Sequence, residues 1–255
     1  MREKQFMKFL INLFFMTITF SSYGNRIPSN NSGIEFKSTT IIQTKISKSL
    51  ILSTELEHMN RLEKRKTQSF LFNFKFRLNK HFTLIANIER KYGERFDEDW
   101  VVSNGTWFWG QNNNRGVNWL YVGAGYKSKW SFLPGTNWKF DITGLYKHNF
   151  HNEQKTFLLS PSLSYLYFSD GKRKNTFFLK NDIFYGLNFA KNNIYRMYNY
   201  LGVLWHPAKN IAIGGFVGRS FYSWFSIESF EKKFNESYEV TNKSTIVGLI
   251  LSTRF

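Results

Sequence analysis

The feature that most constrains this fold is a two-residue alternation between residues 69 and 78. Every second position is large and apolar, in Phe70, Phe72, Phe74, Phe76 and Leu78. The positions between them are mostly polar or charged: Ser69, Leu71, Asn73, Lys75 and Arg77. Successive side chains of a β-strand point to opposite faces, so this segment predicts a strand with one wholly apolar and one polar face.

The same alternation recurs along the chain and predicts ten strands of about 10 to 14 residues each. Their ranges are 49–60, 69–78, 81–91, 117–130, 138–150, 157–168, 177–189, 194–205, 211–222 and 245–255. Segment 33–46 alternates weakly, and Ser47-Lys48 is typical of a hairpin turn. Because bacterial single-chain barrels have an even strand count, the alternatives are ten and twelve strands, and twelve is favoured.

The connections between these strands also alternate in length. If both termini lie at one end of the strands, five connections lie at the other end, and these include the two longest. They are 61–68, 92–116, 151–156, 190–193 and 223–243. The other set, 79–80, 131–137, 169–176 and 206–210, carries turn residues such as Pro134-Gly135 and Asp170-Gly171. This division predicts short periplasmic turns and longer outer loops.

The final segment carries a resemblance to a known class of protein. In residues 245–255, Val247, Leu249, Leu251 and Phe255 share one face, and the other holds Gly248, Ile250, Ser252 and Arg254. This resembles the closing strand of Gram-negative outer-membrane β-barrel proteins, whose signature is a terminal Phe. The resemblance implies an all-β, closed antiparallel transmembrane β-barrel in the cell outer membrane, in contact with membrane lipid and lipopolysaccharide. It also implies Phe255 as the assembly signal for the barrel assembly machinery.

The first residues indicate export. Arg2, Lys4 and Lys8 precede an apolar run over 9–20, and Ser22-Tyr23-Gly24 offers the small residues of a cleavage site. We therefore expect a signal peptide over 1–24, a flexible lead-in over 25–32 and one barrel domain over 33–255. The aromatic content of 19% exceeds what a soluble core of this size needs and suits a lipid-facing surface with aromatic girdles.

The formal net charge is +17, and its placement predicts a basic lumen. Assigning the less apolar face of each strand to the interior gives these pore-lining residues: Lys75, Arg77, Lys91, Lys127, Lys129, Lys139, Lys147, Lys180, Arg196 and Arg254. The acids on the same faces are fewer: Glu55, Glu57, Glu89, Asp141 and Asp182. Unbalanced cations inside a barrel need water, so a hydrated lumen that concentrates anions is expected. Pairing of Glu55 and Glu57 with Lys75 and Arg77 across neighbouring strands is the alternative for that cluster.

These patterns favour a channel for passive diffusion of small anionic solutes, with no cofactor, metal site, nucleic-acid partner or catalytic residue expected. The chain is similar, more distantly, to the small monomeric porins for acidic oligosaccharides. The competing interpretation is a non-conducting barrel that acts as an anchor or adhesin through its long outer loops. An outer-membrane hydrolase is the third, because His148 has Asn149 and His151 beside it, although no serine follows within the strand.

Overall fold

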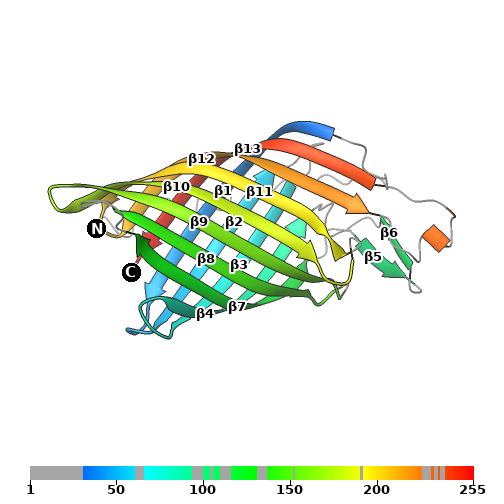
Figure 1. Ribbon diagram of the computed structural model, residues 1–255, viewed down its shortest axis with the longest axis horizontal. Helices are drawn as coiled ribbons and strands as arrows, with labels where there is room; N and C mark the ends of the chain where they lie inside the picture. The colour runs from blue at the N-terminus through cyan, green and yellow to red at the C-terminus, as the bar shows by residue number, and fades with distance from the viewer. Residues whose placement is uncertain are drawn as a thin grey trace.

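The computed structural model describes residues 31–60, 66–93, 100–103, 106–109, 116–130, 137–151, 153–189, 192–225, 231–232, 235 and 239–255. Its strands form a closed barrel with strand order β1-β13-β12-β11-β10-β9-β8-β7-β4-β3-β2, and β5 and β6 make a separate two-stranded sheet (Figure 1). The barrel strands are β1 (Asn31–Lys45), β2 (Leu50–Asn60), β3 (Lys66–Arg77), β4 (Phe82–Gly93), β7 (Val117–Trp130), β8 (Trp138–Asn149), β9 (Lys155–Ser169), β10 (Lys172–Gly186), β11 (Ile194–Ala208), β12 (Ile211–Phe225) and β13 (Glu239–Arg254). The all-β closed barrel that the resemblance implied is confirmed.

The two ends of the barrel differ in the length of their connections. The links β1–β2, β3–β4, β7–β8, β9–β10 and β11–β12 lie at one end, which we call the short-turn end, together with the end of β13. The links β2–β3, β4–β7, β8–β9, β10–β11 and β12–β13 lie at the other, the long-connection end. The hairpin of β5 (Trp100–Ser103) and β6 (Thr106–Trp109) belongs to the β4–β7 link there. The predicted division of the connections into two sets is therefore found.

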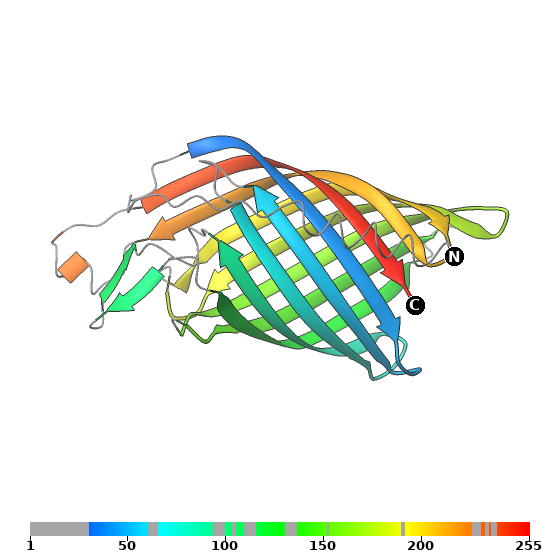
Figure 2. The same ribbon diagram turned by 180° about the vertical axis from the view of Figure 1, so that it is seen from behind.

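The expected even strand count is not confirmed, because the closed barrel consists of eleven strands in the described part of the chain. The turn at Ser47-Lys48 is present, but the segment before it is one continuous strand, β1. This strand pairs with β2 in the antiparallel sense and with β13 in parallel, from Asn31 opposite Asn242 to Gln43 opposite Arg254. A parallel seam places the start of β1 at the long-connection end, at the opposite end of the barrel from the last residues of β13 (Figure 2).

The outer face of the barrel is apolar around most of its circumference. Phe70, Phe72, Phe74 and Phe76 are all exposed, and 47% of Phe72 is accessible. Every barrel strand except β2 carries at least one large exposed hydrophobic side chain, as in Phe36 on β1 and Leu249 on β13. An exposed apolar surface of this extent marks contact with a membrane or another protein.

Pro161 lies inside β9 and interrupts the pairing of that strand with β10. The ladder holds at Ser162 opposite Lys180 and resumes at Leu159 opposite Ile183, without pairs between them. Proline has no N–H to donate, so a break in the ladder is expected at this point. The other edge of β9 keeps its register there, with Pro161 opposite Ile142.

Glycines on β12 and β13 allow the interior to pack closely. A Cβ at Gly248 would lie 2.1 Å from the ring of Phe216, which is buried against it. We expect Gly248→Ala to lower the free energy of unfolding by about 1 to 3 kcal/mol, because the ring has to move within a packed layer. Urea unfolding of the folded barrel measures this, and Gly144→Ala, whose Cβ would meet Phe157 at 3.4 Å, is the control. Equal destabilisation of both variants would contradict the packing argument.

Candidate functional site

The interior contains a polar cavity of about 460 Å³. Bases outnumber acids in its wall: the bases are Lys37, Lys75, Lys91, Lys127, Lys147, Lys180 and Arg196, and the acids are Glu55, Glu57, Glu89, Asp141 and Asp182. Small side chains make the space on one side, where Gly125, Thr143, Ser160 and Ser162 line it. An eight-stranded barrel is just filled by its side chains, so eleven strands leave room for such a cavity.

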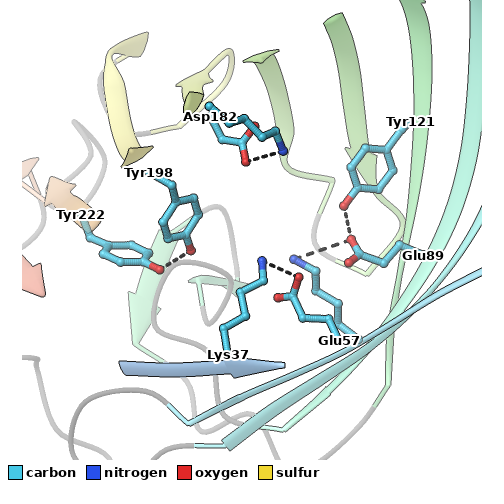
Figure 3. A network of polar contacts seen from close by, with 9 residues as sticks. Lys37, Glu57, Glu89, Tyr121, Asp182, Tyr198 and Tyr222 are labelled. Atoms are coloured by element: carbon cyan, nitrogen blue, oxygen red, sulfur yellow. Dashed lines mark hydrogen bonds and ion pairs between the residues drawn. The ribbon is translucent and has the colours of Figure 1, made fainter. Parts of the chain in front are cut away.

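Several charges in the cavity are paired. The Nζ of Lys37 on β1 lies 2.6 Å from a carboxylate oxygen of Glu57 on β2, and Lys180 lies 2.9 Å from Asp182 on the same strand. Figure 3 shows the side chains of Lys37, Glu57 and Asp182 pointing into one interior space together with those of Glu89, Tyr121, Tyr198 and Tyr222. Neither Lys75 nor Lys127 forms a salt bridge or side-chain hydrogen bond within the described ranges, so these two cations remain for solvent or solute.

The centre of the bore is narrow enough for opposite strands to interact. Lys37 Nζ lies 5.8 Å from the ring centroid of Tyr200 on β11, three strands away through the seam. Lys37 also attracts the carboxylate of Asp182 on β10 electrostatically. The polar side chains at this level therefore cross the lumen rather than only lining it.

Toward the long-connection end, aromatic side chains fill the interior around two buried cations. Lys147 is 2% exposed and lies 4.7 Å from the ring centroid of Trp119 and 4.9 Å from that of Phe184. Arg196 is 4% exposed and lies 3.8 Å from the Phe184 centroid, and Tyr198 is hydrogen-bonded to the hydroxyl of Tyr222. We call Trp119, Tyr121, Phe184, Tyr195, Tyr198 and Tyr222, with Lys147 and Arg196, the aromatic layer. Each desolvated cation–π contact of this kind contributes about 2 kcal/mol, which helps to hold the cations here.

The short-turn end of the cavity is basic. Lys127 lies in this part of the wall, and Arg77, Lys139 and Arg254 are near enough to repel its charge. Lys139 is paired with Asp141. A mouth with this charge raises the local concentration of anions.

The structure places six of the ten predicted pore-lining residues in the wall of the cavity. Lys75, Lys91, Lys127, Lys147, Lys180 and Arg196 line the cavity, while Arg77, Lys139 and Arg254 do not. The side chain of Lys129 lies outside the described residues. Arg77 and Arg254 end their strands, so their side chains reach the rim instead of the wall. Phe255 is exposed, and its backbone N–H donates to the carbonyl of Gln43 at 2.8 Å.

Lys37 was not among the predicted lumen residues, although it forms the salt bridge with Glu57. Glu55 attracts Lys75 electrostatically, in line with part of the alternative pairing of that cluster. Glu57 pairs with Lys37 of β1, and no salt bridge joins it to Lys75 or Arg77 in the described part of the chain. The available signal was the weak alternation of segment 33–46, in which Glu35, Lys37 and Thr39 share the inner face. Without a known partner for that strand, the face of Lys37 stayed unassigned.

Of the residues considered for hydrolysis, Asn149 accepts a hydrogen bond at its Oδ1 from the backbone N–H of His151 at 2.8 Å. The Nδ1 atom of His148 has no hydrogen-bond partner, and its ring packs edge-on against Phe150 with centroids 5.2 Å apart. The residues 94–99 and 110–115 of the long connection lie outside the described residues, and so do the side chains of β5 and β6. Within the described ranges, no group of three His, Cys, Asp or Glu residues is arranged to hold a metal ion.

No helix in the described part of the chain has the length and apolarity to cross a membrane. Comparison with known proteins gave no match, whether to a protein-family model, a curated protein or a solved structure.

Proposed function

We propose that this protein is an integral outer-membrane β-barrel through which small anionic solutes diffuse passively, by way of the polar cavity in its lumen. The observation that carries the proposal is the excess of bases over acids in a cavity of about 460 Å³, inside a barrel whose outer face is apolar. Lys75 and Lys127 supply weak, repeated anion sites, as rings of Lys and Arg do in anion pores.

The outer surface supports membrane insertion. Large apolar side chains cover the barrel wall, with exposed Trp138 and Trp205 toward the short-turn end and Tyr146 and Tyr185 toward the other. Aromatic residues at both borders of an apolar band are typical of transmembrane barrels. Charged and polar side chains line the cavity, and the proposed passive diffusion involves neither a cofactor nor energy input.

A non-conducting barrel that serves as an anchor or adhesin is the second candidate. The contact of Lys37 with Tyr200 across the bore and the dense aromatic layer favour it, because both narrow the lumen. The two candidates predict opposite results in one measurement. A purified, folded barrel in a planar bilayer gives anion-selective current if solutes pass, and no current above the bare bilayer if they do not.

Reversing the charge of Lys75 and Lys127 tests the proposed anion sites. We expect Lys75→Glu with Lys127→Glu to shift the reversal potential in a salt gradient from anion toward cation selectivity, because the sign of the unpaired charge in the wall changes. Lys48→Glu, an exposed turn residue outside the cavity wall, is the matched control and should leave selectivity nearly unchanged. Unchanged selectivity in the double variant would remove these lysines from the pathway.

A further inference from the structure

The β9–β10 hairpin extends beyond its neighbours at the short-turn end. β9 pairs with β8 only as far as Tyr165, which lies opposite Trp138, and β10 begins to pair with β11 at Asn175. Among the described strands, residues 167–174, the hairpin tip, therefore form a two-stranded projection, and Figure 1 shows this hairpin reaching past the β11–β12 turn. A two-stranded hairpin is marginally stable in water, so this tip gains from a surface to pack against.

The tip combines exposed aromatic rings with cations. Tyr167 is 45% exposed and Phe168 is 43% exposed, although as successive strand residues they point to opposite faces. The following strand starts with Lys172, Arg173 and Lys174, and Arg173 lies opposite Phe168. Asp170 and Gly171 have positive φ angles of 53° and 69°, so the turn is tight and keeps the rings close to the cations.

The residues around the hairpin tip are also positively charged. The exposed bases at the short-turn end include Lys45, Lys48, Lys80, Lys209 and Arg254. At the long-connection end, exposed bases and acids are mixed, as in Lys155 beside Glu153 and Lys243 near Glu239. Asp170 is an exposed acid at the short-turn end, but the bases there outnumber it, so the excess of positive charge among the described residues is greater at this end.

We propose that the hairpin tip binds the headgroups of anionic glycerophospholipids. Tyr167 and Phe168 lie at the level of the headgroups, where amphipathic and aromatic rings are stable, and the three cations contact the phosphates. This inference rests on the proposed membrane function, since the lipid must meet a barrel that is already inserted. It adds a specific lipid class and assigns the short-turn end to a phospholipid leaflet.

A single fluorescent label tests the inference directly. The chain contains no cysteine, so Ser169→Cys gives one site for an environment-sensitive dye at the tip. The full barrel is inserted into lipid nanodiscs of phosphatidylcholine alone or with phosphatidylglycerol. We expect blue-shifted, brighter emission only with phosphatidylglycerol, and loss of most of that change when Lys172, Arg173 and Lys174 are replaced by glutamate. High salt should weaken the effect, because exposed charges are screened.

The control reverses three charges at the opposite end, with Lys155→Glu, Lys232→Glu and Lys243→Glu, and should keep the lipid response. Equal emission in the two lipids, or an equal loss in both triple variants, would overturn the inference while an inserted barrel leaves the proposed function intact. Failure of the unmodified barrel to insert into either nanodisc would overturn both. Insertion is checked separately by the heat-dependent gel mobility that folded membrane barrels show.

Discussion

Replacing Phe184 and Tyr198 by alanine is expected to raise the conductance of the barrel severalfold. Both rings line the long-connection end of the cavity, and Tyr198 contributes the hydroxyl bound to Tyr222. The two substitutions remove the ring faces that contact Arg196. They also leave a space next to the polar cavity, and water can enter that space. If the unmodified barrel carries no current, we expect the double variant to carry a measurable current.

The stability of this variant should fall by about 3 kcal/mol or more, since each aromatic side chain is lost from a packed layer. Urea unfolding therefore accompanies the bilayer recording, and only folded protein is counted. Phe72→Ala with Phe74→Ala removes two rings of the outer face and is the matched control, with unchanged conductance expected. A folded Phe184, Tyr198 double variant with the conductance of the unmodified barrel would show that the aromatic layer is not the constriction.

The strands were predictable because the alternation of apolar and polar side chains is a property of each segment by itself. In β3, the four exposed phenylalanines and the inner Asn73 and Lys75 occupy the positions that the pattern assigns to them. Boundaries moved by a few residues where a strand continues past its neighbour, as β9 does to Ser169. The alternation reports which face meets apolar surroundings, and that information does not depend on which strand is the neighbour.

The pairing partner of each strand was harder to predict from the sequence than the strand itself. The omission of Lys37 from the predicted lumen follows from this. β1 has Ile34 and Phe36 on its outer face but Ser38 and Thr40 further along, so its alternation is weak. Parallel pairing with β13 joins segments more than 200 residues apart, and nothing within either segment specifies it. The salt bridge of Lys37 with Glu57 and its contact with Tyr200 depend on that closure, so neither could be predicted.

A disulfide across the parallel seam should form rapidly and stabilise the barrel. Ser38 on β1 lies opposite Leu249 on β13, and both side chains face outward. Adjacent strands lie about 4.8 Å apart, within the range of Cα separations that a disulfide spans. Since the chain contains no cysteine, Ser38→Cys with Leu249→Cys can form only this intramolecular bond.

The expected gain is large because the bond closes a loop that includes most of the chain. The entropy of loop closure gives roughly 5 kcal/mol for a loop of this length, as an upper value. The oxidised variant should therefore unfold at a higher urea concentration than its reduced form, and a non-reducing gel of the unfolded protein should show the compact, crosslinked species.

The control separates this closure from the even-stranded alternative. Ser38→Cys with Leu251→Cys shifts one partner by two residues on the same face, which places the pair about 8 Å apart and beyond disulfide reach. A ten-stranded barrel would instead join β2 to β13 and leave Ser38 outside the wall. Rapid bonding in the first variant and not in the second establishes the parallel register. Equal bonding in both would mean that β1 is mobile at the seam, and Lys37 would then have no fixed position in the lumen.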